Sequence, residues 1–283
     1  MKQGSFQAMG TTVEAWFDAV DRTAALARWF ERVEGRCSRF RPDNELSRIN
    51  RDPALESRTS AMMWQVLSAA DRARTLTEGL VDIGVGSAVA SWGYDRTFAG
   101  VTDIASPRRQ FDVGGWSLSP GDRAIQRQSG TALDLGGIAK GWACDRAVET
   151  GLARVVSAGG DIRSADPGTV TTVMDNRDGI SARVHVGVGA LATSSTTRRR
   201  WRVGGREVSH LVDPRTMKPV ETPVLSATVV ASTAVEAEVG AKAVLIKGAG
   251  GLAWADTTDW IRSALVLWHD GSVFATTGTE LVA

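Results

Sequence analysis

One segment of eight residues, Ser209-His-Leu-Val-Asp-Pro-Arg-Thr216, contains a histidine, an acid, a proline and an arginine. A strand-like run carries His210 and Asp213 into a loop that Pro214 stiffens. A lone histidine is more often structural than catalytic, but this one is followed closely by an acid and a cation. Histidine changes charge near neutral pH and can take a proton as a general base. The sequence therefore predicts His210 as a general base with Asp213 close by.

A second segment combines glycines with a lysine, Asp134-Leu-Gly-Gly-Ile-Ala-Lys-Gly-Trp-Ala-Cys-Asp145. A strand end meets a glycine pair that opens a helix, and Lys140 lies in the first turns. Backbone N–H groups at a helix start, together with this lysine, can bind an anion. The residue order matches neither the Walker A loop nor the dinucleotide fingerprint. A tight turn that packs the helix closely on a sheet explains the glycines equally well, and both interpretations stay open.

Two further segments could face a ligand. Ser157-Ala-Gly-Gly-Asp-Ile162 can bring backbone against a ring and offer a carboxylate, although a plain turn is the simpler interpretation. Ala190-Leu-Ala-Thr-Ser-Ser-Thr-Thr197 is followed by Arg198, Arg199 and Arg200, so hydroxyl and cationic groups could hold phosphates. A solvated loop is the alternative for this segment.

Helices and strands must position these segments. Apolar residues at helical spacing predict helices that begin at Thr23, span 59–77, follow the glycines at 136–137 and begin near Ser232, where Thr233-x-x-Glu236 fits a capping box. Apolar runs predict strands over 6–20, 153–157, 170–174, 182–188, 224–231 and 264–268, with a hairpin turn at Asp270-Gly271. The strands come in pairs, so the sequence predicts an α+β fold with antiparallel sheets flanked by helices.

Composition excludes several classes of function. Among 283 residues, 33 Lys and Arg face 32 Asp and Glu, so the net charge is +1 and no nucleic-acid partner is expected. No apolar run reaches the roughly 18–20 residues of a membrane span, so no membrane insertion is expected. Residues 1–10 hold neither an apolar signal region nor a cysteine for a lipid, which predicts a cytoplasmic location. Cys37 and Cys144 are too few for a disulfide framework or a zinc site, and half-buried thiols are predicted.

Together the segments resemble the FAD:protein FMN transferase family, also called ApbE-like flavin transferases. The resemblance runs from about Met9 to the C-terminus, and its motifs occur in the same order. These motifs are Met9-Gly-Thr11, Ser38-Arg-Phe-Arg41 with Glu45-Leu-Ser-Arg-Ile-Asn50, Asp82-Ile-Gly-Val-Gly86 with Trp92-Gly-Tyr94, Asp134–Asp145, Gly159-Gly-Asp161, Ala192-Thr-Ser194 and His210–Thr216.

The resemblance implies a fold and a reaction. The fold would consist of duplicated, tunnelling-fold-like units with FAD in a cleft between them, in a single domain spanning residues 1–283. FMN would pass through its phosphate to a Thr hydroxyl of a target flavoprotein, and AMP would leave. Hydrolysis of FAD to FMN and AMP, and FAD binding without transfer, stay open as alternatives. The acceptor is expected on another chain rather than in segment 192–197, which matches the family's own binding loop.

Carried over residue by residue, the resemblance makes His210 the base that takes the acceptor proton, with Asp213 and Lys242 as further catalytic residues. The residues expected to contact FAD are Met9, Trp92, Tyr94, Lys140, Asp145, Gly160, Asp161 and Thr193. The Trp and Tyr pair offers the flavin rings a flat wall, and the glycine loops offer N–H groups to the phosphates. Pyrophosphate cleavage needs charge neutralised on phosphate oxygens, by Mg²⁺ or by Lys and Arg.

The chain departs from the family pattern at the metal. The family holds Mg²⁺ with a loop carbonyl, an Asp and a Thr four residues later. Here the carbonyl belongs to Ala139, Glu238 stands at the Asp position and Lys242 stands at the Thr position. Protonated lysine cannot ligate Mg²⁺, so the sequence predicts an ammonium in place of the metal and little dependence on Mg²⁺. Two alternatives stay open. The first is an ordinary i,i+4 surface ion pair, worth about 0.3–0.5 kcal/mol. In the second, Glu238 and the Ala139 carbonyl still hold Mg²⁺ together with waters, and Lys242 points to solvent. Met217 is a second departure, at a position where the family usually has Gly.

Overall fold

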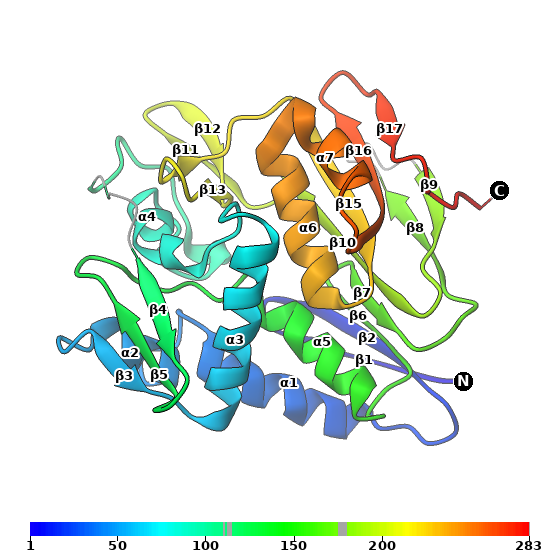
Figure 1. Cartoon of the computed structure of the whole chain (residues 1–283), viewed down its shortest axis with the longest axis horizontal. Coiled ribbons are helices and arrows are strands. Elements are labelled where there is room, and N and C mark those ends of the chain that lie inside the picture. Colours follow the sequence, from blue (N-terminus) through cyan, green and yellow to red (C-terminus); the bar gives the residue numbers. More distant parts are fainter. Residues whose placement is uncertain (110, 112–114, 175–179, 283) are drawn as a thin grey trace. The chain divides into compact units, whose positions relative to one another are not determined.

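The computed structural model describes residues 1–109, 111, 115–174 and 180–282 (Figure 1). The chain forms two compact units. Unit 1 comprises Met1–Arg32, Lys140–Thr197 and Thr222–Ala283, and unit 2 comprises Val33–Ala139 and Arg198–Glu221. Neither unit is one continuous stretch of sequence, so each depends on pairing between distant segments. The single domain over residues 1–283 and the cleft between duplicated units stay predictions.

In the described part of unit 1, the central element is an antiparallel sheet of eight strands. In spatial order these are β1 (Lys2–Ala8), β2 (Thr11–Phe17), β6 (Val155–Ala158), β7 (Asp161–Ser164), β10 (Gly189–Ser195), β15 (Val224–Ala231), β16 (Ile261–Trp268) and β17 (Val273–Ala275). Strands distant in sequence pair directly, because Val13 of β2 lies opposite Ala158 of β6. The sheet thereby holds the glycine turn at 159–160 and the hydroxyl-rich β10 in one framework.

The predicted strand over residues 6–20 is wrong in its bounds. Two strands, β1 and β2, form a hairpin there, with Ala8 opposite Thr11. Met9 and Gly10 make the two-residue turn and adopt φ of 52° and 71°. Such a turn needs positive φ at both central residues, and glycine supplies it readily while methionine does so rarely. The alternating pattern gave no sign of this turn because it continues through it.

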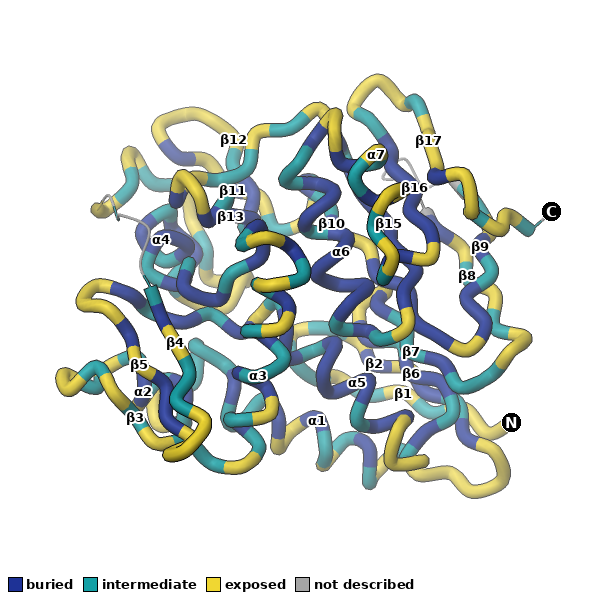
Figure 2. Tube along the Cα trace, viewed as in Figure 1, coloured by how far each residue is buried: buried dark blue, intermediate teal, exposed yellow. Residues whose placement is uncertain are grey.

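Helices pack on one face of the eight-stranded sheet (Figure 1). Two of them contact its strands directly, α6 (Ala234–Lys247) and α7 (Gly251–Asp256). Beside them, α5 (Ala139–Glu149) packs against α6, and η3 (Gly248–Gly250) contacts α6 and α7. The hydroxyl of Thr233 accepts a hydrogen bond of 3.2 Å from the N–H of Glu236, as the predicted cap requires. Most of α6 is buried along its length (Figure 2), because it lies against β10 and β15. This burial fits a helix whose apolar residues are not confined to one face.

The other face of the sheet is covered by a hairpin of β8 (Val170–Met174) and β9 (Ile180–His185). Apolar side chains join the two layers, and they are Val173, Val184, Val186, Leu191, Val230 and Leu265. Successive side chains of β15 point to opposite faces of the sheet. Val229 approaches Gly240 of α6, while Val230 packs against the β8–β9 hairpin. The strands β10, β15 and β16 are therefore buried on both sides, which fits their continuous apolar runs.

Unit 2 combines short helices with small sheets. Its helical elements are α2 (Glu45–Arg51), α3 (Ala61–Leu76), η1 (Ile83–Val85), α4 (Gly86–Ser91) and η2 (Phe98–Gly100). Its strands are β3 (Glu56–Arg58), β4 (Trp116–Ser119), β5 (Ala124–Arg127), β11 (Arg200–Val203), β12 (Arg206–Ser209), β13 (Val212–Asp213) and β14 (Lys218–Pro219). The helix α1 (Thr23–Cys37) runs from the residues of unit 1 into those of unit 2.

Most predicted elements are confirmed. The helices predicted from residue 23, over 59–77, after 136–137 and near 232 correspond to α1, α3, α5 and α6. The strands at 170–174 and 224–231 have the predicted bounds, and Asp270-Gly271 turns the chain between β16 and β17. The α+β class with antiparallel sheets flanked by helices is confirmed.

The structure also describes the two cysteines and the lengths of the helices. Cys37 and Cys144 are free and buried rather than half-buried, and burial raises the pKa of each thiol to about 12. Within the described ranges, no helix has the length and apolar character that a bilayer span requires.

Candidate active site

A cluster of four charged side chains lies inside unit 1, formed by Lys140, Asp161, Glu238 and Lys242. In this ion cluster, Glu238 Oε1 is 3.1 Å from Lys242 Nζ and 3.5 Å from Lys140 Nζ. Lys140 also forms an ion pair with Asp161. The second oxygen of Glu238, Oε2, accepts a hydrogen bond of 3.2 Å from the N–H of Gly141. The cluster therefore contains two ammonium groups and two carboxylates, and its formal charge is zero.

Close packing of α5 on α6 assembles this cluster. A Cβ at Gly141 would lie 2.9 Å from Glu238 Oε2 and 3.0 Å from the backbone of Ala234. Only glycine permits this approach of the two helices. Glu238 and Lys242 are one helical turn apart on α6 and share a face. Close packing in this segment is thus seen at Gly141, between two helices, and it places Lys140 against Glu238.

Burial and charge compete in the ion cluster. Burial alone would raise the pKa of Glu238, but the charges of Lys140 and Lys242 outweigh it and hold the pKa of that carboxyl well below its usual range. Burial lowers the pKa of Lys140, and the charge of Glu238 offsets only part of the effect. Glu238 is consequently an anion at neutral pH, and its charge is neutralised by side chains of this chain.

Asp145 is a residue of α5, and its carboxylate lies at the N-terminus of α6. Its carboxylate accepts hydrogen bonds of 2.7 Å from the N–H of Ala234 and 3.0 Å from that of Val235. Arg163 adds an ion pair at 3.1 Å. Burial raises the pKa of Asp145 to about 6, against the opposing effects of those donors and of Arg163. The structure thus gives Asp145 protein partners at a helix N-terminus, and its predicted contact with FAD stays a prediction.

The glycine segment before Asp161 is a hairpin turn. Gly159 and Gly160 connect β6 to β7 and adopt φ of 64° and 96°. A Cβ at Gly159 would lie 2.5 Å from Thr11 Oγ1, whereas a Cβ at Gly160 would meet nothing within 4 Å. The plain-turn interpretation holds for Gly159, and the open space beside Gly160 leaves room for a ligand.

Two more residues predicted to contact FAD belong to unit 1. Thr193 is an exposed residue of β10, and its hydroxyl lies 2.9 Å from that of Thr228. Met9 forms half of the β1–β2 turn. Thr228 was not predicted from the sequence. It becomes a neighbour of Thr193 only through the pairing of β10 with β15.

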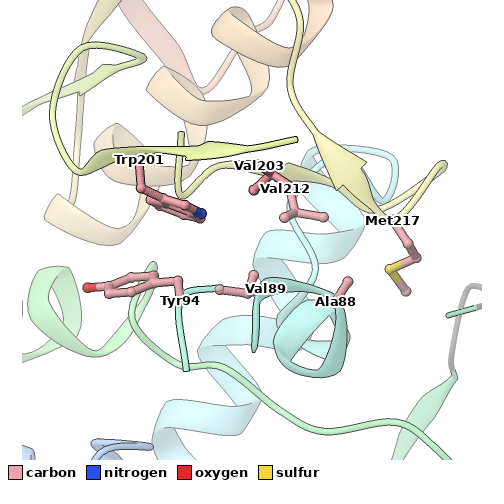
Figure 3. Close-up of a cluster of buried hydrophobic side chains, with 7 residues drawn as sticks. All are labelled: Ala88, Val89, Tyr94, Trp201, Val203, Val212 and Met217. Atoms are coloured by element: carbon pink, nitrogen blue, oxygen red, sulfur yellow. The ribbon is translucent and has the colours of Figure 1, made fainter. Parts of the chain in front are cut away.

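Unit 2 contains an aromatic cluster built around Tyr94 (Figure 3). Its buried members are Ala88, Val89, Tyr94, Trp201, Val203, Val212 and Met217. The Tyr94 ring lies 5.8 Å from Trp201 and 5.5 Å from Phe40, centroid to centroid. Trp92 packs against the cluster, and its indole N–H donates 2.9 Å to the carbonyl of Met217. Trp92 and Tyr94 therefore belong to one cluster, in which Tyr94 is largely a core residue, and their contact with FAD stays a prediction.

His210 lies at the edge of this aromatic cluster, between β12 and β13. Its ring meets the Tyr94 ring edge to face, at 6.4 Å and 88°. Asp213 is instead bound by Arg215, whose Nη2 lies 2.7 Å from Oδ2 and whose backbone N–H donates 2.9 Å to Oδ1. Burial alone would raise the pKa of Asp213, but Arg215 outweighs it and lowers this pKa. In this loop, Asp213 is therefore bound by Arg215.

Arg39 is a residue of unit 2 that the sequence analysis did not single out. Its guanidinium lies 4.3 Å from the Phe40 centroid and 4.7 Å from the Tyr94 centroid. Its Nε forms an ion pair of 2.8 Å with Asp134, the first residue of the glycine segment. Arg39 therefore connects that segment to the aromatic cluster. Its place inside the Ser38-Arg-Phe-Arg41 motif was the available signal.

The backbone conformation at Met217 explains why glycine is favoured at this position. The residue adopts φ of 55°, in the left-handed region, and its N–H donates 2.8 Å to the carbonyl of Asp213. Glycine reaches this conformation without strain. Methionine is retained here with its side chain buried in the aromatic cluster, so packing offsets the backbone cost.

Comparison with known proteins assigns this chain to a family. A family model described as the ApbE family matches residues 9–264. The chain belongs to the ApbE family. Among curated relatives, the FAD:protein FMN transferase of Vibrio cholerae is 28% identical over 273 residues, which cover 85% of this chain and 79% of that protein. The FAD:protein FMN transferase of Salmonella typhimurium is 29% identical over 223 residues, covering 71% of this chain and 64% of that protein, less than two thirds of its length.

Solved structures share the fold of this ApbE-family chain. The crystal structure of the ApbE protein from Thermotoga maritima has a TM-score of 0.84 at 23% identity and covers 98% of this chain and 97% of that one. The flavin transferase ApbE from Vibrio cholerae has a TM-score of 0.77 at 23% identity, with 98% of both chains covered.

The donor set of this ApbE-family chain does not fit a divalent cation at Glu238. Magnesium prefers carboxylate oxygens and water in octahedral arrangement. Both Glu238 oxygens already face N–H or ammonium donors, and the nearby Asp161 is paired with Lys140. Over the described residues, no group of three His, Cys, Asp or Glu side chains gathers where it could hold a metal ion. The metal roles predicted for Ala139 and Glu238 stay predictions without support from this geometry.

Proposed function

We propose that this chain is an FAD:protein FMN transferase, which cleaves FAD, passes FMN through its phosphate to a Thr hydroxyl of an acceptor protein and releases AMP. The observation that carries the proposal is the family match over residues 9–264, which spans every motif from Met9 to His210–Thr216. Curated relatives that match most of this chain bear the name of that activity.

The reaction is a displacement at the phosphorus of the FMN half. The acceptor hydroxyl oxygen forms a bond to that phosphorus, and the bond from phosphorus to the bridging oxygen breaks. AMP leaves with the electron pair of the broken bond, and His210 takes the hydroxyl proton. Removing a proton from the nucleophile in this way typically contributes ~10²–10⁴-fold to a rate.

The residues proposed to contact FAD use two kinds of interaction. In unit 1, Lys140 offers a cation and Gly160 offers open backbone, which suit phosphate oxygens. In unit 2, the rings of Trp92 and Tyr94 suit the flavin. The Tyr94 ring is already packed by Trp201 and Phe40, which fixes its orientation before any ligand arrives.

Incubation of the protein with FAD and a candidate acceptor tests the proposal. Intact-mass analysis should show one FMN phosphoester on the acceptor, and chromatography should show an equal amount of AMP. Release of AMP together with free FMN would replace transfer by FAD hydrolysis. FAD binding without AMP release would leave only a binding function.

The partner and the location are finer points of the same proposal. The acceptor is expected to be another chain that presents a Thr in a short motif, and a cytoplasmic location remains a prediction. A covalent FMN adduct on this chain itself would contradict the separate acceptor.

A further inference from the structure

We infer that Lys242 supplies the positive charge that a divalent cation would otherwise bring to the pyrophosphate, and that Glu238 binds this lysine instead of a metal. The inference rests on the proposed function for its substrate, FAD. Its claim about the metal stands on the geometry of unit 1 alone.

The contacts of Glu238 carry the argument. One oxygen has the ammonium groups of Lys242 and Lys140 at 3.1 and 3.5 Å, and the other accepts the Gly141 N–H. A divalent cation on the same oxygens would lie beside two positive charges in a poorly solvated site, where like charges repel strongly. Both oxygens of Glu238 therefore already have donors, and the two ammonium groups beside Oε1 oppose the approach of a divalent cation.

The exposure of the side chains indicates which groups can reach a ligand. Lys242 and Lys140 keep 16% and 18% of their side-chain surface, whereas Glu238 keeps 5%. An anion approaching the ion cluster consequently meets ammonium groups before the carboxylate. The Glu238 Oε1 contact also holds the Lys242 side chain, so less rotamer entropy is lost when it binds a phosphate oxygen.

An ammonium can do part of the work of a metal ion. When the bond from the FMN phosphorus to the bridging oxygen breaks, negative charge develops on the AMP phosphate. A fixed cation stabilises that charge in the transition state, and loss of one such donor typically costs ~10²–10³-fold in rate. Lysine carries one charge and no coordination geometry, so its effect depends on placement by Glu238 rather than on metal concentration.

A metal titration tests the site without reference to activity. Calorimetry and thermal unfolding of the wild-type protein with MgCl₂, and electron paramagnetic resonance with MnCl₂, should detect no binding. Lys242→Thr, which restores a hydroxyl and removes the ammonium, should gain metal-dependent stabilisation. Stoichiometric Mg²⁺ or Mn²⁺ binding by the wild type that Glu238→Gln abolishes would overturn the inference. The wild-type result decides the question even if the threonine variant fails to fold.

A kinetic experiment tests the charge itself. Lys242→Met should release AMP from FAD ~10²–10³-fold more slowly than the wild type, whether or not Mg²⁺ is present. Lys247→Met is the matched control, because Lys247 lies on the same helix and contacts Trp254 rather than Glu238. Equal rates for the wild type and Lys242→Met, or wild-type activity abolished by EDTA and restored by Mg²⁺, would overturn the inference.

Failure of the proposed function has a different signature. A wild-type protein that releases no AMP would end the proposal of transfer or cleavage. The metal titration, together with the FAD affinity of Lys242→Met measured by flavin fluorescence, would still decide the role of Lys242. Weaker FAD binding with no metal site in the wild type supports that role, and unchanged FAD binding opposes it.

Discussion

The ion cluster of unit 1 and the aromatic cluster of unit 2 bury functional residues in opposite ways. In the ion cluster, Glu238 is balanced by two lysines, so its cost of burial is offset by charge. In the aromatic cluster, Tyr94 is held by Trp201, Phe40 and the Arg39 guanidinium. The first depends on every member keeping its protonation state, and the second depends mainly on shape.

This difference indicates where each cluster tolerates change. Removing one member of a buried ion group leaves an uncompensated charge, while trimming one polar atom from a packed ring leaves most contacts intact. The ion cluster should therefore respond to charge and pH, and the aromatic cluster should respond to volume. Four experiments test this contrast, and they follow in order of decreasing expected effect.

The largest expected effect on the reaction comes from His210, whose imidazole lies at the edge of the aromatic cluster. His210→Ala should lower FMN transfer ~10²–10⁴-fold while FAD binding is retained, because a general base is lost and the other aromatic contacts remain. Acceptor mass shift against time measures the rate. His185→Ala is the control, since His185 contacts Glu280 and the Pro167 carbonyl. Transfer at the wild-type rate by His210→Ala would remove this histidine from the mechanism.

The second experiment compares how much the two clusters contribute to the free energy of unfolding, beginning with Glu238. Glu238→Gln should lower the free energy of unfolding by about 3–5 kcal/mol, because Lys242 then loses its carboxylate partner and Lys140 keeps only Asp161. Urea denaturation followed by circular dichroism measures it. Glu149→Gln, which weakens a half-exposed i,i+3 pair with Arg146, should cost about 0–1 kcal/mol. Tyr94→Phe keeps the packed ring and should cost less than ~1.5 kcal/mol. Equal losses for Glu238→Gln and Glu149→Gln would break the contrast.

The pH dependence should differ in sign between the clusters. The folded-state pKa of Glu238 is lowered, so its contribution is present above its ordinary value of 4.5 and is lost as the pH falls below it. Burial raises the pKa of Tyr94 above 10.0, so that contribution is present below pH 10 and is lost as the pH rises further.

Stability curves of the wild type and two variants measure this difference. Glu238→Gln should flatten the acid limb, and Tyr94→Phe should flatten the alkaline limb. An acid limb that stays unchanged in Glu238→Gln would show that other carboxylates govern acid unfolding.

The smallest expected effect separates a turn from a ligand loop. Gly160→Ala adds a methyl group where no protein atom lies within 4 Å, but φ of 96° strains any side chain there, so a loss of FAD affinity reports contact with the ligand only beyond the loss that a strained turn causes by itself. We expect about tenfold weaker FAD binding, which equals about 1.4 kcal/mol. Gly159→Ala is the control, because its Cβ would meet Thr11 and strain the turn without reference to FAD. Unchanged affinity in Gly160→Ala would leave this glycine as a turn residue.

Local sequence features predicted much of the fold. Thr233 caps α6 within three residues of itself, and the apolar run at 224–231 forms β15 with the predicted bounds. Caps, helical spacing and apolar runs act over short distances, so one stretch of sequence contains all the information they need. The β1–β2 turn escaped prediction because Met9 adopts a backbone conformation that methionine rarely takes.

The candidate site was predicted only in part. The motif order identified the family, and the i,i+4 spacing of Glu238 and Lys242 already placed both on one helix face. The contact of Lys140 with Glu238 spans 98 residues and depends on the close approach of α5 to α6 at Gly141. Arg39 and Trp201 were missed for the same reason, since their contacts with Tyr94 join distant segments.

The sequence by itself therefore determined residue chemistry, helix and strand type, and family membership. Only the tertiary structure decided which charges neutralise one another, because ion pairing depends on distances that packing sets. It showed that Glu238 lies between two lysines and that Asp213 is bound by Arg215. It also showed that Met217 occupies a left-handed position favouring glycine, since backbone conformation at a turn follows from how the flanking strands meet.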